Sequence, residues 1–188
     1  MSRLDHLVAS YKRHVGLPLK INHPLSQRIW FVVYMPEDEA KLPLKLNDFE
    51  MATLDVGLSW HRIDLSGSFA AWIDTYDAEE KEAILKDQEL LNNYAETGYR
   101  NFLGQRIIDC MKAAEVQDVN KAVFALTGLM EFFDFIDVSS VLDIIPSSTP
   151  GVLAVFFPGE KEGTSYRFLN SRTSWDYLAV PIVSEGQS

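Results

Sequence analysis

Ile29-Trp30-Phe31-Val32-Val33-Tyr34 is the stretch that decides the fold of this chain. Its β-branched and aromatic side chains run without a polar interruption, so they predict a strand. A strand that is apolar at every position is covered on both faces, which is typical of a parallel sheet. Pro36 follows closely, with Glu37, Asp38 and Glu39 behind it. A proline followed by acids predicts the start of a helix.

Similar strand patterns recur along the chain and alternate with helical ones. We expect further strands at residues 59–65, 122–126, 152–157 and 177–183, and helices at residues 4–15, 37–56, 101–115 and 138–145. Strands separated by helices imply an α/β fold with a mostly parallel β-sheet of about five strands and helices on both faces. The expected topology is P-loop-like without a phosphate-binding loop. Residues 1–188 are expected to form a single domain.

Several local expectations follow from single residues. Pro43 should kink the helix at residues 37–56 or split it in two. Ser66 is a plausible N-cap for a helix that carries Phe69 and Trp72. Residues 76–97 are charged and irregular, so we expect an exposed helical connection there. Cys110 should be a small buried hydrophobe on the helix at residues 101–115.

The composition excludes several classes of protein. The chain has 27 acidic and 17 basic residues, for a net charge of −10. Because acidic residues oppose the counterion release that drives nucleic-acid binding, autonomous DNA binding is not expected. The single cysteine excludes an internal disulfide framework and a multi-cysteine zinc site. No signal peptide or membrane-spanning stretch is found in the sequence, so we expect a reducing cytoplasm and no membrane partner.

The ends of the predicted strands carry acids where a nucleotide-binding protein would carry a phosphate loop. Ligands of open α/β sheets bind beyond the carboxyl ends of the strands. The patterns G-x-x-x-x-G-K-[ST] and G-x-G-x-x-G are both missing, and no glycine precedes a lysine. Carboxylates repel phosphate unless a divalent cation intervenes. The chain is therefore not expected to hydrolyse nucleotides alone, and no cofactor is predicted.

A metal-dependent hydrolase or nuclease is the alternative that these acids leave open. Asp64, Glu131, Glu160 and Glu162 could all lie near the same sheet edge and hold Mg²⁺ or Mn²⁺. In the competing interpretation they cap helices and solvate loops. No H-x-x-x-H, H-E-x-x-H or G-x-S-x-G pattern occurs, so neither a zinc protease nor a hydrolytic triad is indicated. We predict no catalytic residues and no metal ligands.

Two segments are candidates for recognition. Residues 129–136 are unusually apolar for a loop after a strand, and their Phe132, Phe133 and Phe135 either anchor a partner or fill the core. Residues 158–163 are expected to form a glycine-punctuated loop after the fourth strand. The candidate interaction residues from that loop onward are Pro158, Gly159, Glu160, Gly163, Tyr166 and Arg167. A nucleotide or small-molecule sensor would use this loop as its contact point.

Three parts of the chain together resemble a known family. They are residues 1–7 with 28–34, residues 125–128 with Phe135 and residues 138–139, and residues 156–169 closed by residues 175–182. The run F-F-P-G-E-K-E-G-T-S-Y-R-F-L at residues 156–169 is the most specific of them. In these parts the chain is similar to the BrxB family, a small component of the BREX bacteriophage-resistance systems. It departs from that family after the third strand, where phenylalanines follow Gly128 in place of a glycine-rich segment.

The resemblance implies a place in an assembly. A BrxB-like protein would work beside a PglZ-type phosphatase-superfamily protein, a large ATPase and an adenine DNA methyltransferase, which together methylate host DNA and block phage replication. The implied role is a non-catalytic adaptor that binds the PglZ-type partner, with the ATPase and the methyltransferase as further partners. No catalytic residues are carried over from the family.

Overall fold

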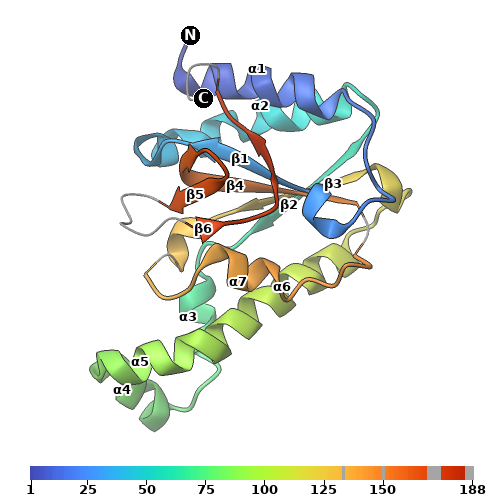
Figure 1. The fold of residues 1–188 in the computed structure, drawn as a ribbon. Helices are drawn as coiled ribbons and strands as arrows, with labels where there is room; N and C mark the ends of the chain where they lie inside the picture. Colours follow the sequence, from blue (N-terminus) through green and yellow to red (C-terminus); the bar gives the residue numbers. More distant parts are fainter. Residues whose placement is uncertain (133, 150, 169–174, 185–188) are drawn as a thin grey trace. The chain divides into compact units, whose positions relative to one another are not determined.

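A computed structural model describes all residues except 133, 150, 169–174 and 185–188. Its contacts divide the chain into two compact units (Figure 1). The sheet unit contains Met1–Ile63, Glu115–Thr127 and Ser147–Ser188, and the helical unit contains Asp64–Ala114 and Gly128–Pro146. Two compact units do not by themselves make two domains, so the single domain over residues 1–188 stays a prediction.

The sheet unit begins with a helix and then alternates strands with short helices. In chain order its elements are helix α1 (Arg3–Val15), the 3₁₀ turn η1 (Leu25–Gln27), strand β1 (Ile29–Tyr34), the 3₁₀ helix η2 (Pro36–Lys41), helix α2 (Leu42–Leu54), strand β2 (Ser59–Asp64), the 3₁₀ turn η4 (Val119–Lys121) and strands β3 (Ala122–Thr127), β4 (Val152–Glu162), β5 (Ser165–Phe168), β6 (Trp175–Asp176) and β7 (Val180–Ile182). The predicted strand at residues 29–34 is confirmed. Pro43 splits the following helix, because it lies in the first turn of α2 directly after η2.

The strands form the predicted α/β sheet. Their order is β2-β3-β4-β1-β7, and β4 also pairs with β5, which in turn pairs with β6. Strand β1 is parallel to both β4 and β7, and β3 is parallel to β4, whereas the β4–β5 and β5–β6 pairs are antiparallel. The mostly parallel sheet is therefore confirmed. The order, with β4 between β3 and β1, is consistent with the predicted P-loop-like topology.

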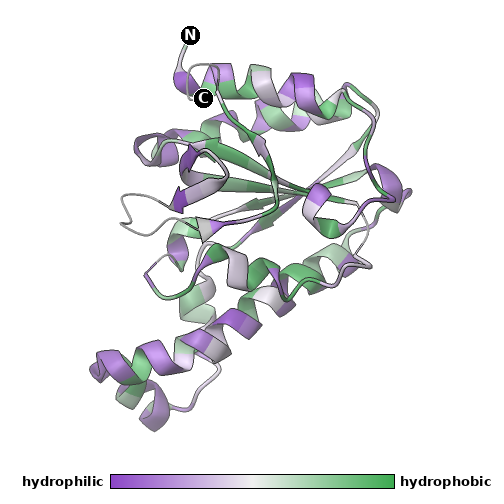
Figure 2. Cartoon of the chain, in the orientation of Figure 1, coloured by the Kyte–Doolittle hydropathy of each residue, from purple (hydrophilic) through white to green (hydrophobic). Residues whose placement is uncertain are grey.

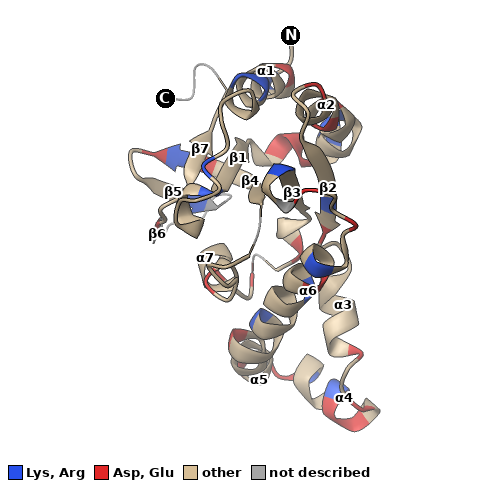
Figure 3. Ribbon diagram, turned by 90° about the vertical axis from the view of Figure 1, so that its right-hand side faces the viewer, with Lys and Arg blue, Asp and Glu red and all other residues tan. Residues whose placement is uncertain are grey.

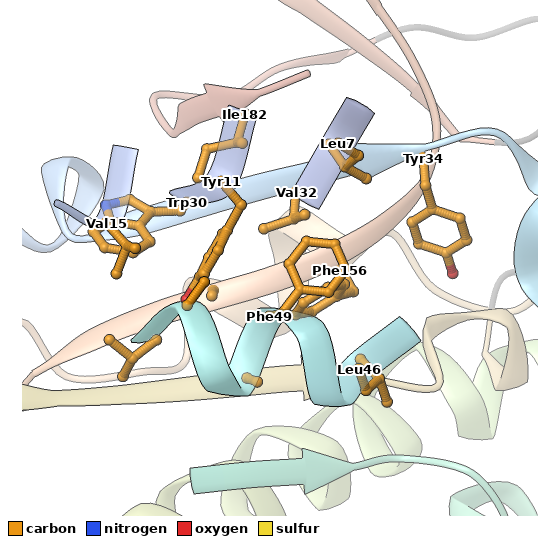
Figure 4. Packing of buried hydrophobic residues seen from close by; sticks show 14 of the residues in the cluster. Leu7, Tyr11, Val15, Trp30, Val32, Tyr34, Leu46, Phe49, Phe156 and Ile182 are labelled. Atoms are coloured by element: carbon orange, nitrogen blue, oxygen red, sulfur yellow. The ribbon is translucent and has the colours of Figure 1, made fainter. Parts of the chain in front are cut away.

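One face of the sheet is covered by α1 and α2 (Figures 1 and 4). The buried cluster between the helices and the strands includes Tyr11 of α1, Phe49 of α2, Trp30 of β1 and Phe156 of β4. Tyr11 lies edge-on to Phe49 at 5.2 Å between ring centroids, and Phe49 lies edge-on to Phe156 at 5.0 Å. All six residues of β1 are buried, as are all six of β3. These strands are correspondingly hydrophobic along their length (Figure 2).

The helical unit contains helices α3 (Ser68–Ile73), α4 (Ala78–Lys86), α5 (Gln88–Tyr94), the π-helical turn η3 (Ala95–Tyr99), α6 (Arg100–Ala113), the 3₁₀ turn η5 (Leu129–Glu131) and α7 (Val138–Leu142). An aromatic cluster holds it together: Trp72 stacks on Tyr99 at 4.9 Å, and Phe69 stacks on Phe135 at 4.9 Å. The connection at residues 76–97 is helical, as expected. It is not wholly exposed, since Ile84 is fully buried.

Charge is distributed unevenly between the two units. The helical unit holds 14 of the 27 acidic residues and only 5 of the 17 basic ones, so it carries −9 of the net charge and the sheet unit carries −1. Acidic residues are frequent on and around α4 (Figure 3). Some of these acids have a local role, because Asp77 caps α4 and Asp87 caps α5 with side-chain hydrogen bonds to backbone amides.

Two local predictions about this unit are wrong. Helix α3 has Gly67 rather than Ser66 at its N-cap position, and no side-chain hydrogen bond is made from that position. The carboxylate of Glu131 instead accepts a hydrogen bond from the backbone amide of Phe69 at 3.4 Å. Cys110 is exposed rather than buried.

Candidate interaction site at the carboxyl end of the sheet

The prediction of a loop at residues 158–163 is wrong. Strand β4 continues through these positions to Glu162, turns at Gly163, and pairs with β5 as an antiparallel hairpin. Gly159 lies opposite Phe168 and Glu160 lies opposite Arg167. The chain can stay extended because the first half of β4 is held between β1 and β3 and its last residues gain a new partner in β5.

The hairpin requires glycine at two of its positions. A Cβ atom on Gly159 would lie 2.2 Å from the carbonyl oxygen of Arg167, so only glycine allows the two strands to approach this closely. Gly163 has a φ of 61°, which is the left-handed conformation that the turn requires. Pro158 and Gly159 are both buried.

An aromatic group anchors the base of the hairpin against β1. Phe31 stacks on Phe157 at 5.3 Å and on Tyr177 at 5.6 Å, and Tyr166 meets Phe31 edge-on at 4.7 Å. Burial raises the pKa of Tyr166 to about 12, so its hydroxyl stays protonated and donates to the carbonyl oxygen of Ala179 at 3.3 Å. Tyr166 was predicted to contact a partner, but its side chain is buried in the fold itself.

The exposed end of the hairpin presents charged side chains. The guanidinium of Arg167 donates to the carboxylate of Glu160 at 2.5 Å and also to that of Glu162. The hydrogen bond to Glu160 and the charge of Glu162 raise the pKa of Arg167. A cavity of about 170 Å³ lies beside this group and is lined by Val33, Glu160, Lys161, Glu162 and Val183.

At the carboxyl end of β1, charged and polar side chains of α1, β1 and η2 pair with one another. Asp38 of η2 is buried, and it accepts hydrogen bonds from Arg3 at 2.9 Å and Lys41 at 3.0 Å. Burial alone would raise the pKa of Asp38, but these two cations outweigh it and hold the pKa below its usual range. Tyr34 donates a hydrogen bond to Glu39. The place where a phosphate loop would stand is thus filled by carboxylates that already have partners.

The four acids proposed as metal ligands have other roles in the described structure. Asp64 accepts from the amide of Ser66 at 3.0 Å, Glu131 accepts from the amide of Phe69, and Glu160 and Glu162 bind Arg167. Among the described residues, no group of three or more histidine, cysteine, aspartate or glutamate side chains could hold a metal ion. The geometry favours the interpretation in which these acids cap helices and pair with cations.

The apolar segment at residues 129–136 mainly fills the core of the helical unit. Phe132 is 1% exposed, Phe135 is half-buried against Phe69, and Phe133 lies outside the described residues. Among the described residues of the segment, Met130 is the one large apolar side chain that is exposed, at 39%. The segment therefore offers a partner less surface than its composition suggests.

Sequence reasoning missed the partner of Asp38. Arg3 lies 35 positions away on α1, so no local pattern joins the two residues. The one available signal was the cluster of acids directly behind a buried strand, since a carboxylate that is buried there requires a cation.

No family model, curated protein or solved structure matches this chain. The resemblance to the BrxB family stays a prediction. Among the described helices, none is long and apolar enough to cross a bilayer.

Proposed function

We propose that this protein is a non-catalytic adaptor of a BREX-type phage-defence assembly and that it binds the PglZ-type protein of its own system. The observation that carries the proposal is the β4–β5 hairpin. Residues 156–168 of the run on which the family resemblance mainly rests fold into a hairpin anchored on β1 that presents Glu160, Glu162 and Arg167 at the surface. In this function the ATPase and the methyltransferase of the system are further partners.

The size of the cavity favours a macromolecular partner over a small molecule. Ligand pockets usually enclose about 300–1,000 Å³ and are largely apolar. The cavity beside the hairpin measures about 170 Å³, and three of its five lining residues are charged. This argues against the nucleotide sensor that the sequence left open. A charged hairpin whose base packs on β1 is suited to selecting a protein partner by complementary charge.

Co-purification of the two proteins, followed by size-exclusion chromatography at micromolar concentration, tests the proposal. We expect them to elute together. The variant Arg167→Glu should weaken the complex, because it places a third carboxylate beside Glu160 and Glu162. Lys112→Glu is the matched control, since it reverses an exposed charge on α6. Separate elution of the wild-type proteins would refute the proposed function.

A further inference from the structure

Helix α2 carries large apolar side chains on the face turned away from the core as well as on the face turned toward it. Its inner face contributes Leu42, Leu46, Phe49 and Ala52 to the buried cluster. On the outside, Leu44 is 82% exposed, Met51 is 50% exposed and Leu54 is 46% exposed.

The exposed apolar side chains lie on one face of α2, in a stripe that the polar Asn47 interrupts between Leu44 and Met51. Leu44, Met51 and Leu54 follow the spacing that places residues on one face of a helix, and Val56, just after the helix, is 42% exposed. Four of the nine large hydrophobic residues exposed in the described chain fall within residues 44–56. Scattered exposed hydrophobics need no explanation, but a gathered stripe marks an interaction surface.

Carboxylates flank the stripe on both sides. Helical geometry places Asp48 and Asp55 along one side and Glu50 along the other. Asp48 pairs with Lys45 at 3.0 Å and Asp55 pairs with Lys12 at 3.7 Å, but these pairs are exposed, so they remain open to exchange for a partner's cations.

The flanking charges decide which partner fits. In a second copy packed antiparallel on the stripe, with the two-fold axis at the middle of α2, Asp48 and Glu50 would each lie near their own symmetry mates, and like charges in an interface are unfavourable. An amphipathic helix with apolar residues in its centre and lysine or arginine on both edges would complement both the apolar side chains of the stripe and the carboxylates that flank it. The 13 residues of α2 offer such a helix a track of about 20 Å.

We propose that the outer face of α2 is a docking surface for a basic-edged amphipathic helix of the PglZ-type partner. The proposal rests on the proposed function, and it adds a second contact to the one at the hairpin. Leu44, Met51 and Leu54 would bury their side chains against the partner, while Asp48, Glu50 and Asp55 would pair with its cations.

The double variant Leu44→Asp, Met51→Asp tests the apolar part of the surface. Its affinity for the purified PglZ-type protein, measured by biolayer interferometry, should fall about 30-fold or more, as for the loss of a central hot spot. The matched control is Leu17→Asp, which places the same charge at a side chain that is 59% exposed outside α2 and should bind like wild type. Circular dichroism and the melting temperature verify that both variants are folded.

Two further measurements separate the possible outcomes. Glu50→Lys with Asp55→Lys should weaken binding several-fold at low salt and less at high salt, because only the charges change. If the wild-type protein binds and the Leu44→Asp, Met51→Asp variant binds equally well, the α2 surface is overturned and the adaptor function stands. No binding by wild type overturns both. Light scattering that finds a dimer of this chain, abolished by the stripe variant, assigns the surface to a second copy and overturns the proposal.

Discussion

The guanidinium of Arg28 donates a hydrogen bond to the carbonyl oxygen of Thr149 at 2.6 Å, although the two residues are 121 positions apart in the chain. The same buried side chain also reaches the carbonyl oxygens of His23, Ser147 and Gly151. All four acceptors belong to the backbone. Burial lowers the pKa of Arg28, which is the cost of holding a cation among neutral acceptors. The contact ties the entry of β1 to the entry of β4.

Arg28→Ala should therefore strongly destabilise the sheet unit. Losing a buried cation that satisfies several carbonyls should cost about 3 to 5 kcal/mol in the free energy of unfolding. Urea denaturation monitored by tryptophan fluorescence measures this, with Trp30 in β1 as a nearby reporter. Arg28→Lys should recover only part of the loss, because one ammonium cannot span the same acceptors. A loss below about 1 kcal/mol, as for an ordinary surface residue, would contradict the role given to Arg28.

Gly159 and Gly163 should respond differently to alanine. At Gly159 a Cβ would meet the backbone of Arg167, so Gly159→Ala should force the hairpin strands apart and cost about 2 to 3 kcal/mol. At Gly163 no atom lies within 4 Å of the added Cβ, and the cost should be about 1 kcal/mol from the positive φ alone. Thermal unfolding of both variants under the same conditions tests the order. Equal losses would mean that the hairpin adapts at Gly159.

The hydroxyl groups of Tyr11 and Thr53 should show an asymmetric response to mutation. They lie 2.7 Å apart in the core, and Thr53 donates its proton to the carbonyl of Phe49 at 2.9 Å, so Tyr11 is the donor between them. Thr53→Val leaves the buried tyrosine hydroxyl without an acceptor and should cost about 1 to 3 kcal/mol, whereas Tyr11→Phe should cost about 1 kcal/mol. In a double-mutant cycle the combined change should cost less than the sum of the two. Strict additivity would mean that the pair contributes nothing.

Much of the fold could be predicted from local patterns. The run at residues 29–34 identified a strand buried on both faces, and Pro43 identified the break between η2 and α2. Both signals act within a few residues. The hairpin was not predicted, because Pro158 and Gly159 are typical of a loop. What keeps them extended is pairing with β5 and the buried ring of Tyr166.

The candidate site was harder to predict, because its partners come from distant parts of the chain. Asp38 binds Arg3, and Glu131 binds the start of α3 across 62 positions. The sequence placed both acids at the ends of strands, yet it left open whether Glu131 holds a metal. The answer required knowing which cations and amides lie beside each carboxylate.

Stability should fall as the pH drops from about 7 to 5.5. Burial and the charge of Lys20 lower the pKa of His14, and burial lowers that of His61. As the pH falls, the unfolded chain, whose histidine pKa values lie near 6.5, takes up protons before the folded chain does. The stability that is present above about pH 6.5 is therefore lost below it. In the double variant His14→Gln, His61→Gln, the free energy of unfolding should not change with pH in this window. An unchanged slope would assign the effect to other groups, since the carboxylates of Asp5 and Asp38, whose pKa values are also lowered, titrate only at more acidic pH.

Cys110 should react readily with a thiol reagent in the native protein. The buried face of α6 is formed by Leu103, Gly104, Ile107 and Met111. A Cβ on Gly104 would lie 2.8 Å from Ile144, so it is the missing side chain that lets α6 pack closely there. Cys110 lies outside this buried face and is exposed, which apolar spacing alone did not predict. Labelling with a maleimide should proceed in native buffer within about tenfold of its rate in urea, as for an exposed thiol.

Gly104→Leu should destabilise the helical unit by about 1 to 3 kcal/mol through overpacking, whereas Cys110→Ser should change stability little.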